Sequence, residues 1–360
     1  ATSTSAGPIS NLTIHPDLER WNWSCWSALI ELVRRLHPDV IHIQYQAAAY
    51  AMHPAINLFP WRLGRLGAPR PRVVTTFHDL RVPYLFPKAG RLRRWVVDEL
   101  ARRSDAVIAT NREDYESLQA RLDTVPALIP IGSNIHPTPP ANYDRDATRT
   151  HWGAGPDDLL LCFFGFVNER KGVDTLLHAL ALLASRVQET PSESASYGFN
   201  PVLLMLGGKT GASDPTNIAY LSHIESLVSE LGLAERIRWS GYLPPEEVTA
   251  SFLAADCCVL PFRDGVSFLH GTFHAALAHG RPIITTQPGS PLPELESGGN
   301  VYLVPAEQPA VLADAIAHLA ASPELCAAMG TGAKNLSERF QWDRIAADTL
   351  DLYHRAGAGA

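Results

Sequence analysis

The sequence has few cysteines and no long apolar run, and both absences exclude classes of protein. Its 360 residues include five cysteines, an odd number without a CxxC spacing, and two of them are adjacent. A disulfide framework or a zinc site would need paired or regularly spaced cysteines. No apolar run reaches the roughly 18–20 residues of a membrane-spanning helix, and the polar N-terminus lacks the basic flank of a signal peptide. We therefore expect a cytoplasmic protein.

The chain also lacks an excess of basic residues, because its Lys and Arg number 30 against 37 Asp and Glu, which gives a net charge of -7. Nucleic-acid-binding chains are usually basic, so this function is disfavoured. Arginines nevertheless gather between Arg62 and Arg103, with few acids among them. A solvated helix face is the simplest interpretation. The alternative is that Arg91–Arg103 contacts an anionic acceptor or, peripherally, the inner face of an anionic membrane.

Two series of apolar strands alternate with helical segments along the chain. The first series has strands at 40–43, 73–77, 106–109 and 127–130, and the second begins at 159–164 and continues beyond 283–285. This alternation predicts parallel sheets with right-handed crossovers, and three prolines between 137 and 140 mark a linker. We expect an α/β protein of two Rossmann-like, doubly wound domains facing a cleft, with ligands at the carboxyl ends of the strands. The expected boundaries are 1–145, 146–340 and a helix over 341–360 that returns to the first domain.

The segment DGVSFLHGTFHAALAHGRPIITT, residues 264–286, suggests a ligand. A loop of Gly, Ser and Thr leads into a helix of small residues, and the free N–H groups and dipole at a helix N-terminus favour an anion. An ordinary loop between a strand and a helix is the alternative. The chain lacks both GxGxxG and Walker patterns, so dinucleotide and ATP binding are disfavoured.

Several blocks in a fixed order resemble one family. They are FFGFVNERKGVDTLLHAL (163–180), GYLPPEEVTASFLAADCCVLPF (241–262) and AALAHGRPIITT (275–286), with PDVIHIQY, VVTTFHDL and LIPIGSNI in the first half. The chain resembles the retaining GT-B glycosyltransferases of family 4, the "group 1" type, over residues 38–357. The resemblance implies a metal-independent, hexosyltransferase-type enzyme. Such an enzyme moves a sugar from a UDP- or GDP-sugar to a sugar, lipid-linked or small-molecule acceptor with retention, and needs no other cofactor.

The resemblance also assigns residues. Lys171 stands where the family's lysine contacts the donor phosphate, and Arg170 is its candidate assistant. His78 would lie near the transferred sugar. The remaining candidates would line the diphosphate, the nucleotide or the cleft below the donor: Gly165, Gly207, Gly208, Asp264, Ser267, Gly271, Thr272, Gly132, Ser133 and Asn134. The alternatives from the residues alone are a surface lysine, a structural histidine and plain glycine turns.

The chain departs from the family pattern in three ways. Phe166 follows Gly165 where many relatives have arginine, and the glutamates of the EX7E pair are replaced by Ser267 and Ala275. A variant of the family that carries DGVS shares this change. The family's opening strand and glycine-rich loop have no counterpart before Trp21, so we expect the first domain to lack its first β-α unit. Truncation of the chain is the first interpretation, and a fold built without this unit is the alternative. A catalytically weak or inactive nucleotide-sugar-binding or regulatory protein is the alternative function.

Overall fold

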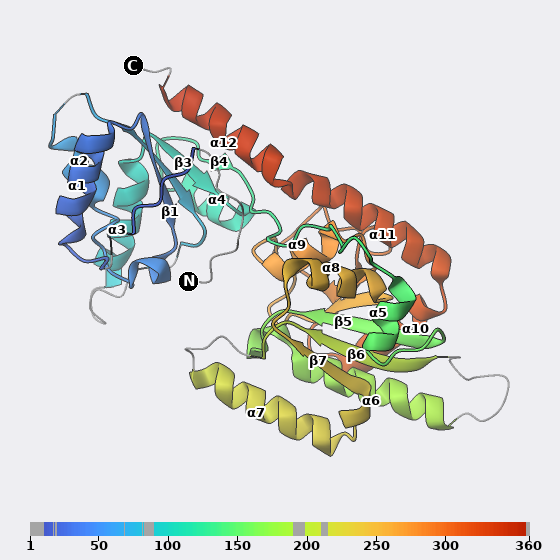
Figure 1. The fold of residues 1–360 in the computed structure, drawn as a ribbon. Helices are drawn as coiled ribbons and strands as arrows, with labels where there is room; N and C mark the ends of the chain where they lie inside the picture. Colours follow the sequence, from blue (N-terminus) through green and yellow to red (C-terminus); the bar gives the residue numbers. More distant parts are fainter. Residues whose placement is uncertain are drawn as a thin grey trace. The chain divides into compact units, whose positions relative to one another are not determined.

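The structure is a computed structural model that describes residues 11–357 apart from 17, 19, 68, 81, 83–89, 190–198 and 210–214. The chain forms two compact units, one made of Ala1–Pro130 with Ala346–Ala360 and the other of Ile131–Ile345. Figure 1 shows the elements of both in sequence colours.

The first unit is built on a four-stranded parallel sheet in the order β1-β2-β3-β4. Its strands are β1 (Val40–Tyr45), β2 (Arg72–Phe77), β3 (Ala106–Ala109) and β4 (Ala127–Leu128). Its helices are α1 (Cys25–Leu36), η1 (Ala47–Tyr50), α2 (Phe59–Gly64), α3 (Gly90–Arg102) and α4 (Arg112–Gln119), with the later part of α12. Apolar residues of the strands, among them Tyr45 and Phe77, pack with helix residues such as Leu100 and Leu118 in one core.

The second unit contains a six-stranded parallel sheet in the order β10-β9-β8-β5-β6-β7. The strands are β5 (Asp158–Phe164), β6 (Asn200–Leu206), β7 (Ile237–Gly241), β8 (Cys257–Leu260), β9 (Ile283–Thr286) and β10 (Tyr302–Val304). Central β5 is buried in all but its first and last residues. This explains its uninterrupted apolar sequence, since parallel strands are covered on both faces.

The helices of this unit cover both faces of the sheet, as Figure 1 shows for α6 and α7 on one side and α8 and α9 on the other. They are α5 (Arg145–His151), α6 (Val173–Glu189), α7 (Pro215–Glu230), α8 (Pro245–Ala254), α9 (Gly271–Ala278), α10 (Pro309–Ala320), α11 (Pro323–Ser337) and the start of α12 (Trp342–Gly357). Short 3-10 turns are η2 (Glu169–Lys171), η3 (Ala234–Arg236) and η4 (Glu338–Phe340). The predicted pair of Rossmann-like α/β domains is confirmed.

All five cysteines are free thiols. Across the described residues no single helix is both long and apolar enough to cross a bilayer. One bent pair of helices, Pro309–Ala320 with Pro323–Gly357, has sufficient length and apolar composition only when the two are taken together.

Candidate functional site

The strand order of the second unit creates a position suited to a ligand. From β5 the chain proceeds outward to β6 and β7, then returns to place β8 on the other side of β5. The loops that follow β5 and β8 therefore leave the sheet in opposite directions, and a crevice forms at their carboxyl ends. Residues 165–172 follow β5 and residues 261–271 follow β8, so both candidate segments from the sequence lie at this edge.

Two glycines allow these loops to approach each other closely. Gly165 has a φ of +121°, and a Cβ there would lie 2.8 Å from Thr272 Cγ2 and 3.1 Å from Lys171 Nζ. Gly172 has a φ of +63°, and its Cβ would lie 2.1 Å from the carbonyl oxygen of Pro261. Both positions need glycine, because the positive φ angles are unfavourable for other residues and a Cβ would clash with the neighbouring atoms. The glycines thus bring the β5 and β8 loops and the start of α9 together.

Lys171 is the cation at the centre of this edge. Its Nζ donates a hydrogen bond of 2.8 Å to Thr272 Oγ1 and lies 5.3 Å from the centre of the Phe262 ring. Burial lowers the pKa of Lys171 from 10.5 to about 8, opposed by the charges of Cys258 and Asp264. Among the described residues Lys171 forms no ion pair. A half-buried ammonium whose one hydrogen-bond partner among the described residues is a hydroxyl is incompletely solvated, and an anion would compensate its charge.

His270 borders Lys171 and was not predicted from the sequence. Its ring stacks on Phe262 with centroids 3.9 Å apart and an interplanar angle of 19°. Burial, and then the charge of Lys171, lowers the pKa of His270 to about 4, so the ring is neutral at physiological pH. Its Nδ1 accepts from the Ser267 backbone N–H at 3.3 Å, which leaves the proton on Nε2. The only signal in the sequence is its position directly before Gly271.

The start of α9 adds backbone donors. Gly271 and Thr272 are the first residues of this eight-residue helix, and N–H groups in a first turn have no partner within the helix. Ser267 precedes it in the loop, where its Oγ accepts from the Leu269 N–H at 3.0 Å. The structure therefore brings Gly165, Lys171 and Thr272 into contact, with Gly271 adjacent in the chain.

Arg170 and Asp264 pair with each other across the two loops. The Arg170 Nε donates to Asp264 Oδ2 at 2.9 Å, and both side chains are more than one third exposed. Arg263, which the sequence reasoning missed, reinforces this junction. Its N–H donates to the Arg170 carbonyl at 2.9 Å, and its guanidinium pairs with Glu169 at 2.7 Å and with Asp174. These contacts hold the loop after β8 against the turn that presents Lys171.

Gly207 and Gly208 follow β6, the neighbouring strand. The Gly207 N–H donates to Ser240 Oγ at 2.9 Å. A Cβ at Gly208 would lie 2.9 Å from the ring of Phe166, and that ring is 55% exposed. The phenylalanine that replaces the family's arginine therefore lies over this glycine turn as an apolar surface.

The two positions of the missing EX7E pair have different surroundings. Ala275 is 1% exposed, and its carbonyl accepts from His279 Nδ1 at 2.7 Å. Ser267 is half-buried in the loop before α9. Only Ser267 has a side-chain group that can hydrogen-bond.

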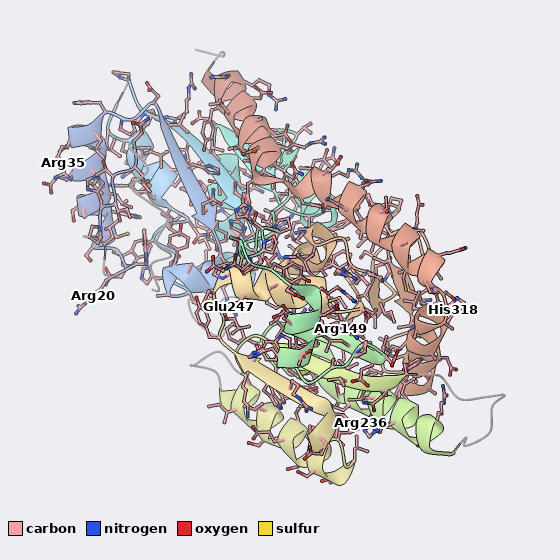
Figure 2. The ribbon with its side chains drawn as sticks, turned by 45° about the vertical axis from the view of Figure 1, so that its right-hand side comes forward. Arg20, Arg35, Arg149, Arg236, Glu247 and His318 are labelled. Carbon is pink, nitrogen blue, oxygen red and sulfur yellow. The ribbon has the colours of Figure 1, made fainter. Side chains whose placement is uncertain are left out.

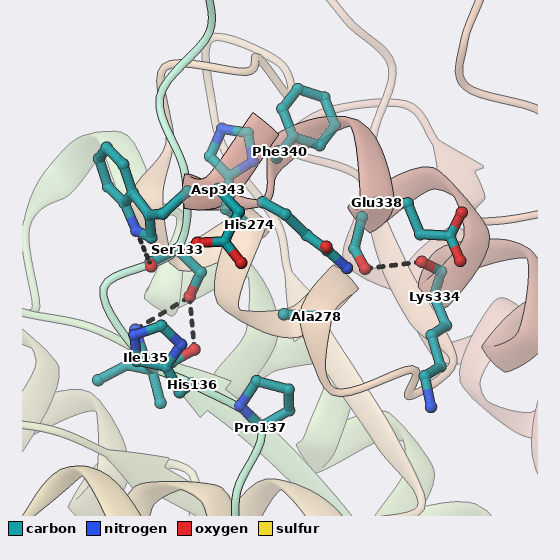
Figure 3. Close-up of a pocket in the computed structure, with 13 residues that line it drawn as sticks. Ser133, Ile135, His136, Pro137, His274, Ala278, Lys334, Glu338, Phe340 and Asp343 are labelled. Carbon is teal, nitrogen blue, oxygen red and sulfur yellow. Dashed lines mark hydrogen bonds between the residues drawn. The ribbon is translucent and has the colours of Figure 1, made fainter. Parts of the chain in front are cut away.

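Gly132 and Ser133, which precede Asn134 in the same turn, contact the C-terminal segment of the second unit. A Cβ at Gly132 would lie 2.6 Å from the Phe340 carbonyl oxygen, and Trp342 Nε1 donates to the Ser133 carbonyl at 2.7 Å. Ser133 Oγ also bonds both polar backbone groups of Ile135, as the dashed lines in Figure 3 show. Asn134 is exposed.

This turn borders the cavity of Figure 3, whose volume is about 250 Å³. One wall is His274, which is 1% exposed. Its Nε2 bonds the Phe268 carbonyl at 2.8 Å, and its Nδ1 has no hydrogen-bond partner among the residues that the structure describes.

His78 lies in the first unit, directly after β2. Its Nε2 is 2.7 Å from Gln44 Oε1, and burial lowers its pKa. His42 on β1 is bonded to Tyr353 Oη at 2.6 Å and to Thr76 Oγ1 at 2.7 Å. Burial, and then His78, lowers the pKa of His42 to about 4. Sequence reasoning did not identify His42, although it occurs in the quoted PDVIHIQY block.

Two sequence-family models match the chain. "Glycosyl transferases group 1" matches residues 158–322 and "Glycosyltransferase Family 4" matches residues 5–135. The D-inositol 3-phosphate glycosyltransferase of Streptomyces bingchenggensis is 29% identical over 265 residues, which are 73% of this chain and 55% of that protein. That of Corynebacterium urealyticum is 27% identical over 71% of this chain and 56% of its own length. The chain thus spans about half the length of the curated relatives it matches.

Solved structures agree on the fold. The sucrose-phosphate synthase of Thermosynechococcus elongatus has a TM-score of 0.66 and 23% identity, over 99% of this chain and 83% of that one. Anabaena HepE in complex with UDP has a TM-score of 0.70 and 19% identity, over 91% and 82%. The fold is that of the GT-B glycosyltransferases. Together with the two family models, these similarities support a GT-B glycosyltransferase of family 4.

Proposed function

We propose that this chain transfers a sugar from a nucleoside-diphosphate sugar to an acceptor hydroxyl, with retention of anomeric configuration. The observation that carries the proposal is the half-buried Lys171 ammonium, which has a hydroxyl partner and no ion pair among the described residues. It lies at a topological switch point, beside the start of α9. A diphosphate would supply the anion that this site lacks.

The site residues would act mainly by electrostatic stabilisation. Lys171 would contact the β-phosphate, and the first N–H groups of α9 would donate to its oxygens, so that charge developing on the leaving group is stabilised. Gly165 and Gly207 would let the backbone approach the donor. In the same-face mechanism of the resembled family, the leaving phosphate takes the acceptor proton. We propose His78 as a group that hydrogen-bonds the transferred sugar.

Metal-independent turnover is part of the proposal, because Lys171 and the α9 N–H groups can carry the charge of the diphosphate. Activity should therefore persist in excess EDTA, and loss of activity in EDTA that added Mg²⁺ restores would contradict this point.

Uridine diphosphate sugars are the first donors to test, with GDP sugars as the alternative. HepE was solved with UDP and with UDP-glucose, and Staphylococcus aureus TarM with UDP and α-GlcNAc-glycerol. The curated relatives are D-inositol 3-phosphate glycosyltransferases. We propose a sugar or a small polyol, free or lipid-linked, as the acceptor class for this chain.

Calorimetric titration with UDP, GDP and their sugars, followed by a turnover assay, tests the function. We expect one nucleoside diphosphate to bind, and its sugar to be hydrolysed or transferred to a product whose anomeric configuration NMR reports as retained. Lys171→Ala should lose most of this turnover. Equal turnover by the wild type and Lys171→Ala would refute the site, an inverted product would refute retention, and binding without turnover would favour the regulatory alternative.

The basic face of α3 is a proposed contact for an anionic acceptor or membrane. Arg91, Arg94 and Arg102 are exposed, and Leu92 and Trp95 on the same helix are 50% and 44% exposed. Exposed apolar side chains between cations suit the interface of an anionic bilayer. Flotation with vesicles of anionic lipid should recover the wild type and lose a variant with Arg91 and Arg94 both changed to Gln. Equal recovery of the two would refute the contact.

A further inference from the structure

A second cavity of the second unit lies at the opposite edge of the same sheet. Its volume is about 700 Å³, and it is lined by the residues that begin or precede four of the parallel strands, Asp158, Phe199, Cys257 and Pro282. The Lys171 site lies at the carboxyl ends of these strands. Strands of this length rise about 3.3 Å per residue, so the two edges are roughly 20 Å apart. The cavity is therefore separate from the proposed donor site.

Arginines converge on this cavity around one carboxylate. Asp256 accepts hydrogen bonds from Arg145 at 2.7 Å and from Arg149 at 2.8 Å, and also from the Leu160 N–H at 2.8 Å. Arg149, which Figure 2 labels on α5, is 3% exposed and donates in addition to three backbone carbonyls. Arg149 and Asp256 therefore form a structural pair, and the charge of Arg145 is only partly compensated.

Arg281 has no carboxylate partner among the described residues. Within the described part of the chain it makes one hydrogen bond, a long one of 3.3 Å from Nη1 to the Leu253 carbonyl, and its buried Nε has no partner there. Burial, and then repulsion from Arg145, lowers the pKa of Arg281 from its ordinary value, and the charge of Asp256 opposes this only in part. Burial raises the pKa of Tyr143, and the charges of Arg145 and Arg281 oppose this increase. The Tyr143 hydroxyl is also buried, without a hydrogen-bond partner among the described residues.

The other charged residues of the wall do not neutralise this cluster. The Asp158 carboxylate accepts from the Gly155 N–H at 2.6 Å and from Asn200 Nδ2 at 2.9 Å. Asp157 is exposed, and so is Lys334, which adds a further cation. The neighbouring His279 has both ring nitrogens bonded, to the Ala275 carbonyl and to Thr249 Oγ1.

We infer that this cavity binds an anion of the phosphate class between Arg145 and Arg281. A tetrahedral dianion would give the Arg281 guanidinium the acceptors it lacks and would separate two like charges. Guanidinium groups suit phosphate because they donate two parallel hydrogen bonds. The volume exceeds what inorganic phosphate needs, so the occupant is a small phosphorylated molecule. This site does not depend on the proposed glycosyl transfer.

Calorimetric titration of the full chain at low ionic strength tests the inference, with inorganic phosphate, glycerol 3-phosphate and glycerol as probes. We expect both phosphates to bind, the ester at least as tightly as the free ion, and glycerol not to bind. Arg281→Gln and Arg145→Gln should each weaken binding about tenfold or more, the loss typical of a charged hydrogen bond. Arg35→Gln removes an exposed arginine of α1 in the other unit and should have no effect.

Phosphate could bind at this cavity or at the proposed donor site, and the Lys171→Met variant distinguishes the two because it weakens binding only at the donor site. Phosphate binding that survives Lys171→Met and is lost in Arg281→Gln supports the inference. The inference would be overturned if phosphate binding were lost in Lys171→Met and unchanged in both arginine variants. It would also be overturned if neither phosphate bound to the wild type. The Arg145 side chain is 44% exposed, so the Arg145→Gln variant should fold. It therefore tests the inference even if Arg281→Gln fails to fold.

Discussion

Replacing Lys171 by Met should stabilise the free protein and weaken its binding of nucleoside diphosphate. Methionine keeps the length and apolar stem of lysine and removes the buried charge. The fall of the Lys171 pKa from 10.5 to about 8 measures how unfavourable the charge is in the folded state. At about 1.4 kcal/mol per pKa unit this is about 3.5 kcal/mol, from which the loss of the bond to Thr272 subtracts about 2 kcal/mol. We therefore expect a net gain of about 1–2 kcal/mol in the free energy of unfolding.

The same change should have the opposite effect on the ligand. A charged hydrogen bond to phosphate contributes about 1.5–3 kcal/mol, so the affinity for UDP, or for GDP if that is the nucleotide bound, should fall roughly 10- to 100-fold. Urea unfolding and calorimetric titration measure the two effects on the same protein. A Lys171→Met protein that is less stable than the wild type and binds the nucleotide equally well would contradict both expectations.

The pH dependence of binding provides an independent measurement on Lys171. A bound diphosphate favours the charged ammonium, so binding above pH 8 must take up a proton and the affinity should fall as the pH rises. The pKa of Lys171 is lower in the folded state than in the unfolded chain, so between pH 8 and 10.5 the unfolded chain binds more protons. The contribution of Lys171 to the free energy of unfolding therefore rises with pH across that range. In Lys171→Met both of these contributions should be absent. A wild-type affinity that is flat from pH 7 to 9.5 would contradict the assignment.

Three other substitutions test the packing described above, each by urea unfolding. Thr272→Val should lower the free energy of unfolding by about 2 kcal/mol, because it leaves the half-buried Lys171 ammonium without its hydrogen bond. An unchanged free energy of unfolding would show that this hydrogen bond does not stabilise the fold. Gly172→Ala, at a φ of +63° and with a Cβ 2.1 Å from a carbonyl oxygen, should cost about 3 kcal/mol or more, whereas Gly64→Ala meets nothing within 4 Å and should be neutral or stabilising. Equal effects would refute the contrast. Tyr353→Phe removes the 2.6 Å bond to His42 and should cost about 1 kcal/mol; an unchanged midpoint would show that this bond contributes nothing.

The apolar patterns of the sequence were sufficient to predict the strands. The run at 159–164 is β5, and the runs at 73–77 and 283–285 are β2 and β9. Buried parallel strands are apolar throughout, which makes them visible without knowledge of their neighbours. The order of the strands in the second sheet determines where the topological switch point lies, and no local sequence pattern predicts that order.

Contacts between distant residues could not be predicted. Lys171 and Thr272 are 101 positions apart, and their hydrogen bond depends on the two glycines that allow the loops to meet. The stacking of His270 on Phe262 and its neutral state likewise result from burial in the fold. The arginine cluster at the amino edge was not anticipated, because Arg145 and Arg281 are isolated in the sequence.

A crystal structure with the bound nucleoside diphosphate is the most direct test of the central claim. We expect the β-phosphate about 3 Å from Lys171 Nζ, the usual length of such a bond, and beside the first N–H groups of α9. A diphosphate found only against Arg281 at the amino edge, with the bond between Lys171 and Thr272 undisturbed, would contradict it.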